Sequence, residues 1–345
     1  MFREIASPLR GIAMTQLHCT NCFYQLILKK SMKTELFKKP LPYLALFMAH
    51  LIWGANFVVA KITLEEIPTM SLGFLRFGLA CLLMIPFLAT FEGNDKKIKV
   101  EHLPMLIFGG LLIVTFNIAL FYEGLMRTTA INASVISLSV PIFSVLAGWM
   151  FLKEKLYVVN FLGIIFGLLG ALVILGLPVI LSSNFSAVSF MGNMLILLCS
   201  LSFVWGSIIF KKMFKYYPPI IITSFVFLVG AVSFLVPAVL EYIKDPTWTS
   251  QISILGVLGL LYITILSSVS AYFLMTWGLS KVDLNKASLI QYIEPAIAAT
   301  LAIPLLGERI SYSFIIGTCL VVLGVYWGTM GKNQHHIHHH RHHRS

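Results

Sequence analysis

Ten apolar runs of about twenty residues each divide the chain, and they limit its fold more than any other feature. Each run is long enough to cross a bilayer core of about 30 Å as an α-helix, and none alternates like an outer-membrane strand. Charged residues make up only 11% of the chain, against about 25% in soluble domains. We therefore expect an all-α integral membrane protein with ten transmembrane helices. The predicted spans are residues 42–61, 70–91, 103–122, 130–151, 157–176, 188–210, 220–240, 254–275, 287–306 and 311–330.

The positive net charge of +11 follows the topology and does not indicate a nucleic-acid-binding face. With a cytoplasmic N-terminus, twenty of the 25 Lys and Arg residues fall in cytoplasmic segments and four on the opposite side. Arg76 lies within a run. Cytoplasmic loops of membrane proteins carry such an excess of positive charge. The sequence therefore predicts that both termini are cytoplasmic.

An internal repeat organises the chain. Residues 124–170 align without a gap on residues 278–324, with eleven of 47 positions identical. Near the start of each half the offset changes from 154 to 152, and Trp53-Gly54 aligns with Trp205-Gly206. Each repeat then holds five helices, and an odd number inverts the second copy in the membrane. Inverted repeats with a site near the midplane are typical of secondary transporters.

Several short motifs lie within these repeats. They are Trp-Gly-Ala-Asn-Phe at 53–57 followed by Lys61, Leu-Arg-Phe at 75–77, Phe-Leu-Lys-Glu at 151–154, Leu-Leu-Gly-Glu at 305–308, and Glu294-Pro295. Each motif is weak alone, but together, at one repeat period, they resemble the EamA branch of the drug/metabolite transporter superfamily. The resemblance covers residues 42–330.

This resemblance implies a ten-helix carrier of the bacterial inner membrane, usually an exporter of metabolites, amino acids or drugs. We accordingly expect a secondary active transporter that moves a small organic solute by alternating access. The alternative is a membrane sensor or enzyme that binds a lipid-like ligand without moving it. The expected parts are a basic extension at 1–41, the repeats at 42–176 and 188–330, and a His/Arg-rich cytoplasmic tail at 331–345.

Glu294 is the sharpest candidate for chemistry, because ionisable residues inside spans are costly and often functional. Its repeat equivalent is Val140, so internal symmetry does not explain the carboxylate. It is either a proton-coupling group facing a cavity or a carboxylate tied to neighbouring backbone or Lys where Pro295 bends the helix. These readings are evenly balanced.

Two polar stripes flank the prolines of the fourth and ninth spans. Gln291 lies one turn before Glu294, and we expect it to line a central cavity. The serines fit interhelical hydrogen bonding better, although Ser137 is also a cavity candidate. The stripes are Ser134, Ser137 and Pro141 in the first repeat and Ser288, Gln291 and Pro295 in the second.

One reading of Arg76, in the second span, is that it binds a substrate carboxylate. The favoured reading is that it snorkels or pairs with an acid near the same side, namely Glu65, Glu66 or Glu123. From its depth we expect no direct pairing with Glu294.

Aromatic and amide side chains supply further cavity candidates, although packing or interfacial anchoring is the favoured reading for any one of them. The aromatic and amide side chains in question are Trp53, Asn56, Asn117, Tyr122, Trp205, Tyr272 and Trp277, and the cavity candidates among them are Trp53, Asn56, Asn117, Trp205 and Tyr272.

The glycine pairs at 163/167 and 324/328 predict close contact between the fifth and tenth spans within one chain.

Catalytic and cofactor motifs are missing from the sequence, which contains no Walker A, HExxH or GxSxG pattern. We expect no enzyme activity, no cofactor and no structural metal; the His-rich tail at 335–343 is a solvated segment that touches metal at most weakly. The expected partners are a small-molecule substrate and the lipid bilayer. The sequence leaves the oligomeric state open, and one chain suffices for the repeat.

Residues 1–31 have no counterpart in the repeat and no long apolar core. We expect Met32 to be a more natural start, with 1–31 an over-extended gene model or a dispensable basic extension. An interfacial helix on an anionic membrane surface is the alternative.

Overall fold

The structure is a computed structural model, and it describes residues 40–90, 98–152, 158–175, 186–281, 289–310 and 312–330. The expectations for the N-terminal extension, the His-rich tail and Ser288 lie outside these residues. The chain divides into two compact units, Met1–Leu44 and Ala45–Ser345. In the first unit only the start of one helix is described, so the fold below is that of the second.

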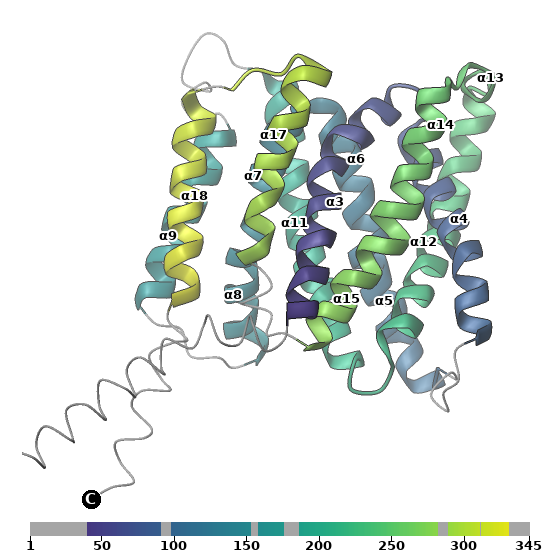
Figure 1. The fold of residues 1–345 in the computed structure, drawn as a ribbon, viewed down its shortest axis with the longest axis horizontal. Helices are drawn as coiled ribbons and strands as arrows, with labels where there is room; N and C mark the ends of the chain where they lie inside the picture. Colours follow the sequence, from purple (N-terminus) through teal and green to yellow (C-terminus); the bar gives the residue numbers. More distant parts are fainter. Residues whose placement is uncertain are drawn as a thin grey trace, which may run out of the picture. The chain divides into compact units, whose positions relative to one another are not determined.

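Within the described residues all regular structure is helical (Figure 1). Most elements are α-helices, with 3₁₀ turns at η2 and η5 and π-helical stretches at η3 and η4. In chain order the elements are α3 (Pro40–Leu64), α4 (Thr69–Thr90), η2 (Val100–His102), α5 (Leu103–Gly110), η3 (Leu111–Phe116), α6 (Asn117–Arg127), α7 (Ala130–Ile136), α8 (Ser139–Leu152), α9 (Val158–Leu175), α11 (Ala187–Met213), α12 (Pro219–Lys244), α13 (Trp248–Gln251), α14 (Ile254–Leu261), η4 (Tyr262–Ser270), α15 (Ala271–Lys281), η5 (Leu289–Tyr292), α17 (Ile293–Leu306) and α18 (Tyr312–Met330).

Each of the ten predicted spans is helical over most of its described residues, so the all-α membrane fold is confirmed. Within the part of the chain that the structure describes, six helical segments are long and apolar enough to cross a membrane. They correspond to the first three predicted spans of each repeat. The full count of ten crossings stays a prediction.

The third and eighth spans share an unusual three-part construction. In each, an α-helix of eight residues leads into a π-helical stretch and then an α-helix of eleven residues. The π stretch is six residues long in η3 and nine in η4. π-helical segments are rare and frequently lie at functional sites. Their matching positions show that the sequence repeat is also a structural repeat.

The helices pack in the pairs expected if a pseudo-two-fold axis relates the two repeats. Equivalent helices pack on each other: α4 on α12, α7 on α17 and α9 on α18. The first span contacts the eighth, because Trp53 donates to the carbonyl of Ser267 and Tyr262 donates to the carbonyl of Ile52. The sixth span correspondingly packs on the third. Exchanging the two repeats leaves this pattern unchanged. The inverted-repeat prediction is thus matched by the packing.

The contact between α9 and α18 is reciprocal, as the glycine pairs predicted. A Cβ added to Gly170 would lie 2.6 Å from the carbonyl oxygen of Gly317, and one added to Gly324 would lie 2.7 Å from that of Gly163. These four glycines are repeat equivalents in pairs. Figure 1 shows the two helices side by side. Because such a contact uses the same surface from both halves, it has the form of a two-fold interface.

Candidate functional site

A cavity of about 140 Å³ lies among the helices of Ala45–Ser345, and both repeats line it. Eight of the nine cavity candidates from the sequence contribute to its wall, although their functional roles remain proposals. They are Trp53, Asn56, Arg76, Asn117, Ser137, Tyr272, Gln291 and Glu294.

Trp205 does not line this cavity, although its repeat equivalent Trp53 does. Its side chain is 37% exposed, and its ring packs on Phe151 at 4.5 Å between centroids. Trp53 turns inward instead and donates its indole N–H to the carbonyl of Ser267 at 3.1 Å. The repeat preserves the residue type but not its surroundings.

The helices of the fourth and ninth spans are discontinuous beside the cavity, where the sequence predicted only kinks. In the fourth span α7 ends at Ile136 and α8 begins at Ser139, so Pro141 lies in the first turn of α8. The ninth span changes from a 3₁₀-helix to an α-helix: η5 ends at Tyr292, and Pro295 lies in the first turn of α17. Proline has no N–H and is tolerated in a first turn, whereas inside a helix it leaves a carbonyl unpaired. Discontinuous helices form the midplane sites of many transporters.

The two discontinuities meet at the pseudo-two-fold axis. The Gln291 side-chain amide donates to the carbonyl of Ser137 at 3.4 Å, and these residues are exact repeat equivalents, 154 apart. A residue can contact its own equivalent only near the symmetry axis. Proline at 141 cannot donate to that carbonyl, which accepts from the Val140 N–H and from Gln291 instead. The polar stripes therefore surround the centre of the molecule.

Glu294 is buried and paired with a histidine that the sequence analysis did not select. Its carboxylate lies 2.7 Å from Nδ1 of His50, and the two side chains are 4% and 2% exposed. Among the described residues the recorded partner of the Glu294 carboxylate is His50, whereas the sequence suggested a backbone group or a Lys. Because the two groups touch in a dry site, a proton taken up by either one changes the charge of the pair.

Gly54 explains how the first span comes close enough to make this pair. A Cβ at Gly54 would lie 3.1 Å from the Cα of Glu294 and 2.9 Å from the Cβ of Ile297. The glycine lets α3 rest directly on the α17 backbone. His50 lies one helical turn earlier on α3, where its ring reaches the carboxylate. The Trp-Gly motif thus has a packing reason.

An aromatic row continues from His50 along the cavity wall. Its ring packs edge-on against Trp53 at 5.6 Å, and Trp53 packs edge-on against Tyr272 at 5.4 Å. Edge-to-face pairs at such distances are favourable beyond their buried area. The row holds the histidine ring in place and gives the cavity an aromatic side.

Arg76 is buried to 2% exposure and bonds to hydroxyl groups, not to the acids near its end of the membrane. Its Nε and Nη2 donate to the hydroxyls of Ser268 and Ser267 at 2.6 and 3.3 Å, and its Nη1 donates to Tyr122 at 3.2 Å. The serines are neighbours in the π-helical η4, which brings both to one side chain.

Two of the three nominated acids, Glu66 and Glu123, have other partners. Glu123 pairs with Arg127 at 2.5 Å, and Glu66 accepts from the hydroxyl and N–H of Ser253 at 2.6 and 2.7 Å. The Ser253 hydroxyl, and then its N–H, hold the pKa of Glu66 below its usual value. Glu66 therefore caps the start of α14, and pairing of Arg76 with these acids is not observed.

Two cavity residues carry buried polar atoms that have no protein partner within the described chain: Nε2 of His50 and Oδ1 of Asn56. Buried polar atoms are nearly always hydrogen-bonded, so such exceptions need an explanation. A cavity that binds a polar solute provides one. Asn117 contrasts with them, because its amide donates to the Cys199 carbonyl at 3.0 Å.

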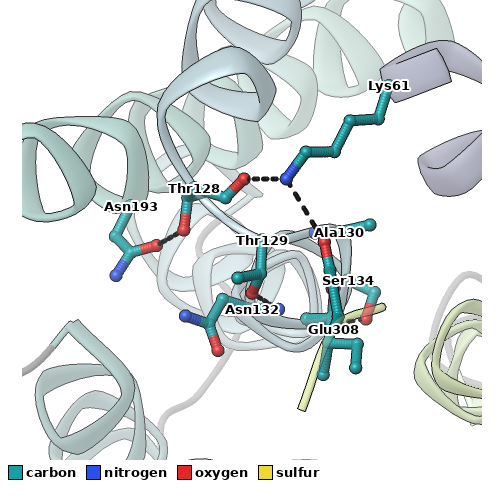
Figure 2. Close-up of polar contacts among 9 residues, drawn as sticks. Lys61, Thr128, Thr129, Ala130, Asn132, Ser134, Asn193 and Glu308 are labelled. Atoms are coloured by element: carbon teal, nitrogen blue, oxygen red, sulfur yellow. Dashed lines mark hydrogen bonds and ion pairs between the residues drawn. The ribbon is translucent and has the colours of Figure 1, made fainter. Parts of the chain in front are cut away.

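A second polar cluster ties together three spans at the end of α3. We call it the Lys61–Glu308 clasp; it consists of Lys61, Thr128, Ala130, Ile131 and Glu308. Figure 2 labels all of these residues except Ile131. Lys61 Nζ lies 2.5 Å from the Thr128 carbonyl and 3.2 Å from the Glu308 carboxylate. That carboxylate also accepts from the first N–H groups of α7, on Ala130 and Ile131, at 2.6 and 3.0 Å.

Gly307 places Glu308 in this clasp. Its φ of 64° is left-handed, a conformation that favours glycine and ends α17. The next residue then turns toward α7, where a carboxylate complements the positive end of the helix. The Gly-Glu motif at the end of the ninth span is therefore a link between the spans.

Comparison with known proteins decides the family. Residues 40–176 and 190–330 match the EamA-like transporter family. The chain belongs to this family. It is a multi-pass membrane transporter of small metabolites, and neither the family nor its relatives' names indicate an enzyme.

Relatives of similar length support this membership. The chain is 27% identical to the uncharacterized transporter YoaV of Bacillus subtilis (strain 168), over 83% of this chain and 96% of YoaV. It is also 27% identical to a probable amino-acid metabolite efflux pump of Salmonella typhimurium, over 84% and 94%. An uncharacterized transporter of Archaeoglobus fulgidus is 28% identical, over 85% and 98%.

The fold is also found among solved structures. A crystal structure of another protein matches with a TM-score of 0.59 and 17% identity, covering 85% of this chain and 98% of that one. At this identity the likeness concerns the fold alone.

Proposed function

We propose that this EamA-family protein is a secondary active transporter that exports a small organic metabolite by alternating access. The observation that carries the proposal is the cavity at the pseudo-two-fold axis, between two discontinuous helices of inverted repeats. In such proteins, exchanging the conformations of the two halves moves the opening of a central site from one side to the other. The name of the Salmonella relative, an amino-acid metabolite efflux pump, supports export and an amino-acid-like solute.

Proton coupling through Glu294 is the second part of the proposal. A carboxylate inside the membrane is costly, and here it shares a buried site with His50. Uptake of a proton on one side and its release on the other would drive substrate in the opposite direction. The ring contacts of His50 with Trp53 and of Trp53 with Tyr272 fix the His50–Glu294 pair relative to the cavity wall that would contact the substrate.

The Lys61–Glu308 clasp fits this cycle as a closure on one side. It joins the end of α3 to the start of α7 and to the end of α17, and its bonds must break before these ends separate. The distribution of Lys and Arg supports an orientation with this end outside a bacterial inner membrane and both chain termini in the cytoplasm. Reporter fusions test this orientation: 211–219 should be cytoplasmic and 177–187 periplasmic.

The function itself is tested by comparing metabolites in cells that overexpress the protein and cells that lack it. Overexpressing cells should lose one or a few small metabolites to the medium, and purified protein in liposomes should move the same compounds. Unchanged uptake and efflux, with a ligand still bound to the purified protein, would support a sensor in place of a transporter.

A further inference from the structure

We propose that Arg76 binds a carboxylate group of the transported solute, so that the substrate class is small organic acids, including amino acids. This inference rests on the proposed transport function and specifies what its cavity selects. The guanidinium lines the cavity yet is only 2% exposed. It combines a fixed charge, a dry setting and access to the space that a solute would fill.

The charge of Arg76 has no acidic partner among the described residues. Its three hydrogen bonds go to hydroxyl oxygens of Tyr122, Ser267 and Ser268, and no described ion pair includes it. A buried charge that is left without a counter-charge is strongly destabilising. Hydroxyl dipoles offset only part of this cost, so an anion entering the cavity would be strongly favoured.

The carboxylate in the cavity wall, that of Glu294, already has a partner. Glu294 is bonded to His50, and Trp53 lies between that pair and the Ser267 contact of Arg76. The cavity therefore has two separate ionisable poles. One is a carboxylate–imidazole pair suited to proton exchange, and the other is a guanidinium suited to an anion.

The hydrogen-bond geometry favours a carboxylate over a larger anion. A guanidinium has five N–H donors, and three are used in the bonds to the hydroxyls. Two remain for the ligand, which matches the two oxygens of one carboxylate. The rest of the wall is largely apolar, including Phe57, Phe121 and Phe203. A carboxylate with an apolar remainder fits this lining.

Purified protein in detergent tests the site with matched probes: L-phenylalanine and L-leucine, each compared with its carboxamide. The amides keep the size and the amino group but lose the anionic group. Wild type should bind each acid on the order of tenfold or more tightly than its amide, as expected for charge-assisted hydrogen bonds. Arg76→Gln should abolish that preference, and Arg76→Lys should retain part of it. Arg127→Gln, in the ion pair with Glu123, should leave it unchanged.

A chemical protection experiment on wild type removes any dependence on folding of the variants. Phenylglyoxal modifies arginine, and the modified residues are located by peptide mass spectrometry. The acids should protect Arg76 and the amides should not, while Arg127 in the same molecules reacts equally with both. Equal protection by acid and amide, or no preference for acids in binding, overturns the proposal. Protein that binds acids through Arg76 yet moves none of them in liposomes would instead overturn the transport function.

Discussion

Replacing Gly54 by alanine tests whether close packing of α3 on α17 builds the His50–Glu294 pair. The added Cβ would lie 2.9 Å from the Cβ of Ile297, 3.1 Å from the Cα of Glu294 and 3.2 Å from its carbonyl oxygen. Two of these atoms are backbone and cannot rotate away, so the helices must separate by several tenths of an ångström. Overpacking of this kind costs about 1 to 3 kcal/mol.

Gly78 on α4 provides the matched control, because nothing lies within 4 Å of a Cβ added there. Gly78→Ala should leave stability unchanged or raise it by up to about 1 kcal/mol through helix propensity. Thermal unfolding in detergent, followed by tryptophan fluorescence, compares the two variants. Gly54→Ala should unfold at a lower temperature and lose proton-driven flux. Equal unfolding temperatures for the two variants would refute the packing argument.

Three further perturbations test other parts of the molecule. Glu308→Gln weakens a charge-assisted contact with α7 and should lower the free energy of unfolding by about 1.5 to 3 kcal/mol. Glu101→Gln, in an exposed pair with Lys99, should change it by less than about 1 kcal/mol. Equal effects of the two variants in denaturant unfolding would contradict a stabilising role of the Lys61–Glu308 clasp. Trp53→Leu should reduce flux in liposomes while Trp205→Leu preserves it, and the reverse order would show that the wrong tryptophan has been placed in the cavity. The lowered pKa of Glu66 means that its carboxylate stabilises the fold above its ordinary value of 4.5, and that this stabilisation is lost as the pH falls through the lower pKa of the folded state. The unfolding temperature of wild type should therefore fall in that acidic window, and that of Glu66→Gln should fall less. Parallel pH profiles of the two unfolding temperatures would contradict this.

The helical segments and the repeat were predictable because they depend on local properties. Apolar runs of membrane length and a constant offset between equivalent residues need no knowledge of contacts. The same offset identified Ser137 and Gln291 as equivalents, and the structure brings them together. Glycine spacing likewise predicted the contact of α9 with α18.

The pairing of residues far apart in the chain was not predictable from one sequence. His50 and Glu294 are 244 residues apart, and His50 by itself looks like a packed core histidine. The partners of Arg76 depend on η4, whose π-helical geometry turns Ser267 and Ser268 to one side. In spans that are apolar on every face, the sequence also does not say which face meets lipid. The sequence therefore did not show that Trp205 lies outside the cavity that Trp53 lines.

The pH-gradient-driven flux of Glu294→Gln in proteoliposomes tests the central claim most directly. The substitution keeps the shape of the side chain and its contact with His50 but removes the carboxylate that takes up a proton. The account predicts that an imposed pH gradient no longer drives substrate movement, while exchange of substrate across the same membranes persists. Gradient-driven flux at the wild-type rate in this variant would contradict the account.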